Sequence, residues 1–163
     1  NVELWDMAQE TLHRLEPAAA KRGIRLSLRG EHAAVRAVRP VLDEMIYNLC
    51  DNAIKYNKDN GKVTVTITPG DKIRLEVRDT GIGIPPAHQS RVFERFYRVD
   101  KSHSKEIGGT GLGLSIVKHG AQLHGADVTL QSVVGRGTIV VLSFPCVEAA
   151  AAGQRDKAEG GRM

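Results

Sequence analysis

The 163-residue chain has little of several features that define whole classes of proteins. Its two cysteines, Cys50 and Cys146, lie far apart and have no second Cys or His at metal-ligand spacing, so we expect buried free thiols in a reducing compartment. Aromatic residues make up 4% of the chain and no dense Lys/Arg stripe occurs, which argues against a nucleic-acid partner. No stretch approaches the ~18 uninterrupted apolar residues of a membrane span, so we expect no direct membrane insertion.

What is present is typical of one globular domain. Hydrophobic residues form 41% and charged residues 26% of the chain, and both signs of charge are spread along it with a net +4. We expect a domain over residues 1–145 and a disordered tail over 146–163, where Ala, Gly and charged residues follow no pattern. Because the first residue is Asn rather than Met, we expect the chain to be part of a longer protein.

Hydrophobic periodicity predicts helices and strands that fit an α+β fold. The order of these helices and strands along the chain favours a two-layer α/β sandwich, with a mixed, mostly antiparallel sheet and helices on one face. We expect the first helix to be kinked or broken at Pro17. The expected helices cover residues 1–22, 40–55 and 112–123, and the expected strands cover 24–28, 34–38, 63–67, 73–77, 127–133 and 138–144.

Asp79 ends a predicted strand on the side that should face the core. Period two continued beyond Val77 turns its carboxylate inward, where it needs a hydrogen-bond donor. The donor could be the backbone of the following loop, in a turn bond. It could also be the exocyclic amine of a base, which Gly81 and Gly83 would let approach the backbone closely.

One face of the 40–55 helix carries Glu44, Asn48, Asn52 and Lys55. This face could be a solvated surface, but Asn is a poor helix former and two of them stacked at mid-helix need a reason. Amide oxygens suit Mg²⁺, which takes one or two protein ligands and leaves the others to phosphates and water. A lysine one turn further would reach phosphate.

A glycine-rich run precedes the 112–123 helix. Its backbone N–H groups and the helix N-terminus suit an anion, although the run is neither a Walker loop nor a Rossmann fingerprint. The patternless stretch before it is typical of a lid. The run is Gly108-Gly109-Thr110-Gly111-Leu112-Gly113.

Five short motifs occur in order along the chain. They are Asn48-Leu-Cys-Asp-Asn52-Ala-Ile-Lys55-Tyr56, Asp79-Thr-Gly81-Ile-Gly83, Phe93-Glu-Arg-Phe96-Tyr97, Gly109-Thr-Gly111-Leu-Gly113 and Gly135-Arg-Gly137-Thr138. In order and spacing they resemble the N, G1, F, G2 and G3 boxes of bacterial sensor histidine kinases. Their detailed sequence is similar to that of phosphate-sensing and cell-wall-sensing kinases, and the resemblance implies the Bergerat ATP-binding fold.

The resemblance implies a role for each matching residue. Mg²⁺ would be bound by Asn52 with Asn48 beside it, and Asn48, Lys55 and Arg98 are the implied catalytic residues. The adenine contacts would be Asp79, Tyr56, Gly81, Gly83 and Thr138. The phosphate contacts would be Lys55, Arg98, Lys101, Gly109, Thr110, Gly111, Leu112 and Gly113, while Phe93, Phe96 and Tyr97 would anchor the lid or belong to the core.

The implied function is transfer of the ATP γ-phosphate to a histidine on a separate dimerisation domain, for relay to a response regulator. None of the six histidines has a phosphoacceptor context, so that domain is expected elsewhere in the same receptor, at the cytoplasmic face of a membrane. Two alternatives stay open. The chain could be an ATP hydrolase of the same fold, although Asn48 stands where those enzymes carry a water-activating Glu, or a non-catalytic nucleotide sensor.

Overall fold

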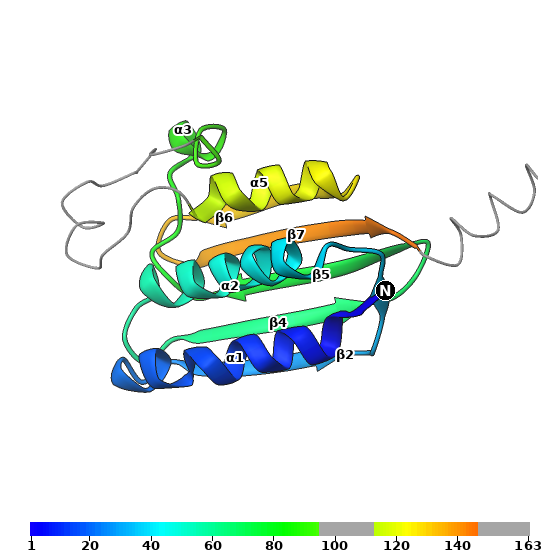
Figure 1. Cartoon of the computed structure of the whole chain (residues 1–163). Helices are drawn as coiled ribbons and strands as arrows, with labels where there is room; N and C mark the ends of the chain where they lie inside the picture. The colour runs from blue at the N-terminus through cyan, green and yellow to red at the C-terminus, as the bar shows by residue number, and fades with distance from the viewer. Residues whose placement is uncertain (95–112, 147–163) are drawn as a thin grey trace, which may run out of the picture.

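A computed structural model of the chain describes residues 1–94 and 113–146. They form two layers, a five-stranded sheet and a layer of helices on one of its faces (Figure 1). The strand order is β2-β4-β5-β7-β6, with β2 and β4 parallel and the other pairs antiparallel. The fold class predicted from the sequence is confirmed. The sheet strands are β2 (Arg25–Gly30), β4 (Lys62–Thr68), β5 (Lys72–Asp79), β6 (Asp127–Val133) and β7 (Gly137–Pro145).

Alternation in the strands turns one side chain in two toward the helices. In β4, Val63, Val65 and Ile67 are fully buried, while the threonines between them face away. Val65 lies opposite Val77 of β5, which fixes the register of the hairpin. The same register carries Asp79, two residues beyond Val77, to the end of β5 on the inner side.

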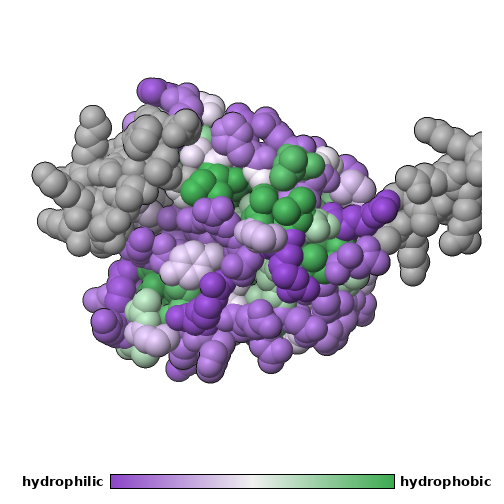
Figure 2. Space-filling view, viewed as in Figure 1, coloured by the Kyte–Doolittle hydropathy of each residue, from purple (hydrophilic) through white to green (hydrophobic). Residues whose placement is uncertain are grey.

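The helix layer consists of α1 (Leu4–Lys21), α2 (Arg39–Lys55) and α5 (Gly113–Leu123), and the short α3 (Pro86–Gln89) lies apart from it. Proline 40 stands in the first turn of α2, where its missing N–H removes no helical hydrogen bond. The buried stripe of α2 packs against the sheet and its neighbouring helices, so hydrophilic residues predominate on the outer face seen in Figure 2. The stripe is Leu42, Met45, Ile46, Leu49, Cys50, Ala53 and Ile54.

The first helix differs from its prediction at its start. It begins at Leu4 rather than Asn1, because Val2 and Glu3 form β1 (Val2–Glu3), which pairs with β3 (Ala34–Val35). The Glu3 carboxylate accepts a hydrogen bond from the N–H of Trp5 and caps the helix. At the other end, the helix continues unbroken through Pro17 to Lys21.

The prediction that both cysteines are buried is half wrong. Cys50 lies in the core, and burial raises the pKa of its thiol to about 12. Cys146, just after β7, is only partly buried. The expected tail from residue 147 onward lies outside the described residues. In the described part of the chain, no helix has the length and hydropathy of a membrane span.

Candidate functional site

Four segments that are distant in sequence meet at one end of the sheet. They are the last turns of α2, the end of β5, the first turn of α5 and the start of β7 (Figure 1). The antiparallel pairing of β5 with β7 places Arg78 opposite Ile139, so the ends of these two strands lie side by side. Six of the residues predicted from the sequence to bind nucleotide lie on these segments, namely Asn48, Asn52, Lys55, Asp79, Gly113 and Thr138.

Asp79 is the central acidic group of this end. Its Oδ1 accepts hydrogen bonds from the N–H of Gly81, at 2.9 Å, and from the N–H of Thr138, at 3.2 Å. Burial raises the pKa of this carboxyl to about 6, and the two N–H donors oppose that rise. Neither of these hydrogen bonds uses Oδ2. A ligand that offers an N–H to Oδ2 would therefore bind a carboxylate already oriented by the backbone.

Two glycines shape the loop beside that carboxylate. A Cβ on Gly81 would collide with the carbonyl oxygen of Tyr56 and lie 2.9 Å from Cα of Asn57. Gly83 has φ +75°, and a Cβ there would collide with the carbonyl of Val133. The loop therefore packs backbone to backbone on the end of α2 and on the β6–β7 turn, which only glycine allows.

The asparagine face of α2 meets the N-terminus of α5. A Cβ on Gly113 would lie 3.0 Å from Nδ2 of Asn52 and 3.4 Å from Oδ1 of Asn48. Asn48 donates from Nδ2 to the carbonyl of Glu44, at 2.7 Å, which orients the rest of its amide. Both asparagines are half-buried, while Glu44 on the same face is exposed.

The two asparagine amides fit a hard cation that takes most of its ligands from phosphate and water. Asn52 and Asn48 offer amide oxygens, and the adjoining N-terminus of α5 attracts the anion that such a cation accompanies. Among the described residues, no group of three His, Cys, Asp or Glu side chains could hold a metal by itself.

Lys55 is engaged within its own helix. Its Nζ lies 2.9 Å from Oδ2 of Asp51, one turn earlier, and its side chain is about one-third exposed. The phosphate contact of Lys55 stays a prediction. Tyr56 caps the end of α2, and its carbonyl accepts a hydrogen bond from the N–H of Ile82 at 3.1 Å.

Thr138 connects Asp79 to the β6–β7 hairpin. Its N–H donates to the carboxylate, and its hydroxyl lies 2.8 Å from Oγ of Ser132. Ser132 Oγ also accepts from the N–H of Ile84, at 2.7 Å. This bond joins the glycine loop, the loop that contains Gly81 and Gly83, to the same hairpin.

A profile of the family described as histidine kinase-, DNA gyrase B- and HSP90-like ATPases matches residues 37–148, which is more than half of the chain and includes all four of these segments. The chain belongs to this family.

Sensor histidine kinases are among the similar proteins within this ATPase family. The chain is 40% identical over 110 residues to sensor histidine kinase WalK of Bacillus subtilis, covering 66% of this chain and 18% of WalK. It is 39% identical over 128 residues to the phosphate regulon sensor protein PhoR of Pseudomonas aeruginosa, covering 78% of this chain and 27% of PhoR. The mycobacterial sensor histidine kinase MprB has a solved structure with a TM-score of 0.76 at 28% identity, covering 88% of this chain and 95% of that structure.

The resemblance read from the five motifs is therefore confirmed, including the likeness to a phosphate sensor. The chain spans less than one-third of the length of WalK and PhoR and corresponds to their ATP-binding catalytic domain. Several residues predicted for the lid and the phosphates lie outside the described residues. They are Arg98, Lys101, Gly109, Thr110, Gly111 and Leu112, together with Phe96 and Tyr97.

Sequence analysis missed three residues that organise this ATPase domain's site. Asn57 is 3% exposed and donates from Nδ2 to the carbonyl of Lys62, yet in sequence it is one of several polar residues in a turn. Arg22 and Ser132 gave no signal either, because their partners lie far away along the chain. The two roles considered for Asp79, a turn bond to the backbone and a bond to the amine of a base, are compatible, because the backbone donors occupy only Oδ1.

Proposed function

We propose that this chain binds Mg²⁺-ATP and transfers its γ-phosphate to a histidine on a separate dimerisation domain of the same receptor, for relay to a response regulator. The observation that carries this proposal is one end of the sheet, where Asp79 is partly buried and oriented through Oδ1, and where the asparagine face of α2 meets the N-terminus of α5. An inward carboxylate suits the adenine amine, and the asparagine face with a helix N-terminus suits a metal-bound polyphosphate.

Each described residue then has a defined task. Oδ2 of Asp79 accepts from the exocyclic amine, Tyr56, Gly81, Gly83 and Thr138 shape the adenine pocket, and Lys55 supplies charge to the phosphates. Asn52, with Asn48, holds the metal, which when bound neutralises phosphate charge. Positioning and charge neutralisation are the main catalytic contributions expected in phosphoryl transfer.

The reaction needs little covalent chemistry from this chain. A ring nitrogen of the acceptor histidine attacks the γ-phosphorus with its lone pair, the bond from that phosphorus to the β–γ bridging oxygen breaks, and ADP leaves with the electron pair. Asn48 favours transfer over hydrolysis. It lies one turn before Asn52, and an amide that donates to the Glu44 carbonyl has no basic group with which to activate water.

The test is transfer of radiolabel from γ-labelled ATP. The chain alone should bind ATP but neither label itself nor release phosphate quickly, and with the cognate dimerisation domain added it should label that domain. Transfer in trans should be weak, because tethering normally raises the effective concentration to roughly mM. Acid treatment should remove the label, since phosphohistidine is acid-labile.

Three outcomes would contradict the proposal. Rapid phosphate release by the chain alone would indicate the ATP hydrolase. Binding without transfer to the acceptor domain would indicate a nucleotide sensor. Label that survives acid would exclude phosphohistidine as the product.

A further inference from the structure

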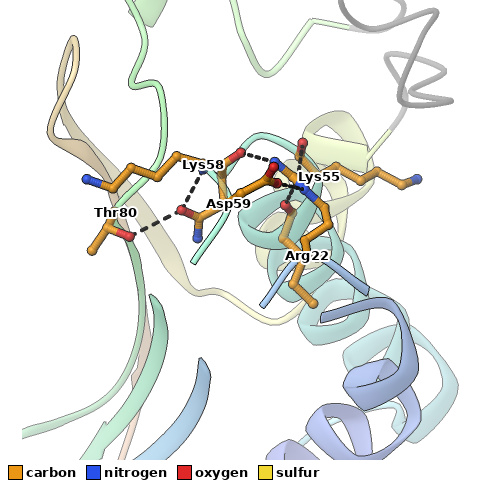
Figure 3. A network of polar contacts seen from close by, with 7 residues as sticks. Arg22, Lys55, Lys58, Asp59 and Thr80 are labelled. Carbon is orange, nitrogen blue, oxygen red and sulfur yellow. Dashed lines mark hydrogen bonds and ion pairs between the residues drawn. The ribbon is translucent and has the colours of Figure 1, made fainter. Parts of the chain in front are cut away.

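Arg22 reaches from the end of α1 to the end of α2 (Figure 3). Its Nη1 donates to the carbonyls of Ile54 and Lys55, the latter at 2.9 Å, and its Nη2 donates to the carbonyl of Asn57. Its Nε donates to Oδ1 of Asp59 at 3.1 Å. One guanidinium therefore holds three carbonyls at the end of α2 and one carboxylate of the following turn.

These contacts suit arginine in particular. The last carbonyls of a helix have no partner within the helix, and a cation there also interacts favourably with the helix dipole. The Arg22 side chain is 30% exposed, and its planar fork can bridge several acceptors at once. A lysine would keep the charge, but its three N–H donors come from one nitrogen and lack the planar fork.

The turn that Arg22 holds is joined to the end of β5. The buried side chain of Asn57 accepts at Oδ1 from the N–H of Lys58, at 2.9 Å, and from the hydroxyl of Thr80, at 3.2 Å. Its Nδ2 donates to the carbonyl of Lys62 at 3.0 Å. Thr80 directly follows Asp79, so the turn after α2 and the strand that carries the carboxylate are linked side chain to side chain (Figure 3).

The glycine loop rests on the same turn. Gly81 packs against the carbonyl oxygen of Tyr56 and Cα of Asn57, and Ile82 donates its N–H to the Tyr56 carbonyl. A shift of the turn would therefore move Gly81, one of the two donors that orient Asp79. Asn52 and Asn48 lie further back on α2, against Gly113 of α5, and do not rest on this turn.

We infer that Arg22 is a positioning residue for base recognition: by fixing the turn after α2, it aligns Asp79 and Gly81 and so determines the preference for adenine over guanine. The inference rests on the proposed function. Adenine offers an amine donor at the position where guanine has a carbonyl acceptor, and a carboxylate accepts only from the donor. Misalignment of Asp79 should thus weaken ATP binding much more than GTP binding.

The experiment compares Arg22→Gln with Arg14→Gln. Arg14 is a matched control because it also lies on α1 and contacts α2, through Asp43 at 2.9 Å and the Tyr47 ring at 5.1 Å, but in the first half of that helix. The affinities for non-hydrolysable ATP and GTP analogues are measured with and without Mg²⁺, at a temperature where circular dichroism shows each variant fully folded.

For Arg22→Gln we expect the ATP affinity to fall about tenfold, the scale of one or two hydrogen bonds, and the ratio of ATP to GTP affinity to fall with it. The enhancement of ATP affinity by Mg²⁺ should stay as in the wild type. Arg14→Gln should keep both the affinity and the ratio. Arg22→Lys should lower the ratio as well, since an ammonium cannot bridge all four acceptors.

A purely structural role would weaken the binding of both nucleotides equally and leave the ratio unchanged. That result would overturn this inference but not the proposed function. A ratio for Arg22→Gln no lower than that for Arg14→Gln would overturn it too. If Arg22→Gln does not fold, Arg22→Lys is judged by the same two criteria. A wild type that binds neither analogue would overturn the proposed function and this inference with it.

Discussion

Replacing Asp79 by Asn should separate the stability of this domain from its function. The wild-type carboxyl has its pKa raised to about 6 by burial, so the ionised form is disfavoured in the folded chain. Above pH 6 the folded protein must hold that charge, whereas in the unfolded chain the charge is solvated. The asparagine is neutral, and its Oδ1 can still accept from Gly81 and Thr138.

The magnitude follows from the same pKa. A pKa rise from 3.8 to about 6 corresponds to about 3 kcal/mol at ~1.4 kcal/mol per pKa unit. Partial contact with water reduces that penalty. We therefore expect Asp79→Asn to add about 1 to 3 kcal/mol to the unfolding free energy at pH 8. The penalty in the wild type is complete above the folded pKa near 6 and disappears as the pH falls toward the unfolded value of 3.8. The advantage of the variant should therefore shrink between pH 6 and 4.

ATP binding should change in the opposite direction. The amide presents a donor where the adenine amine needs an acceptor, so the variant should lose about 1.5 to 3 kcal/mol of binding free energy, the scale of a hydrogen bond to a charged group. In the wild type, affinity should weaken as the pH falls below 6 and Asp79 becomes protonated. The phosphates titrate too, so the wild type is compared with Asp79→Asn at each pH.

The measurements are urea unfolding at pH 8 and pH 4.5 and calorimetric titration with a non-hydrolysable ATP analogue at pH 8. Asp71→Asn is the control, because this carboxylate lies on the exposed turn between β4 and β5 and should affect neither quantity. A folded Asp79→Asn with wild-type affinity would remove Asp79 from the site. A variant that is less stable than the wild type at pH 8 would refute the argument from burial.

Three further predictions concern the helices. Asn52→Ala should abolish the Mg²⁺ dependence of ATP affinity while leaving unfolding by urea nearly unchanged, and a wild-type response to Mg²⁺ would refute the metal assignment. Gly113→Ala should weaken Mg²⁺-ATP binding, because its Cβ would lie 3.0 Å from the Asn52 amide and displace it; an unchanged titration would show that Asn52 can move without loss. Gly120→Ala should lower the unfolding free energy by up to about 2 kcal/mol, since overpacking against buried Met45 outweighs the ~1 kcal/mol gain in helix propensity, and it should spare ATP affinity.

Sequence periodicity was enough to predict the three long helices, the five strands of the main sheet and the fold class. The buried stripe of α2 and the alternation in β4 and β5 repeat at fixed intervals along the chain, so they can be recognised without knowing the partners. The start of α1 could not be predicted in this way, because Val2 and Glu3 pair with β3, some thirty residues away. The partial exposure of Cys146 likewise depends on where β7 ends in the folded sheet.

The sequence by itself determined the chemical inventory of the site. The inward direction of Asp79, the glycines after it and the asparagine face of α2 are local properties of a strand, a loop and a helix. Only the tertiary structure decided how these groups are held. Asp79 is oriented by Thr138, fifty-nine residues later, and the end of α2 is held by Arg22, more than thirty residues earlier. Such contacts depend on how the packed layers bring distant segments together, and no local period in the sequence encodes that.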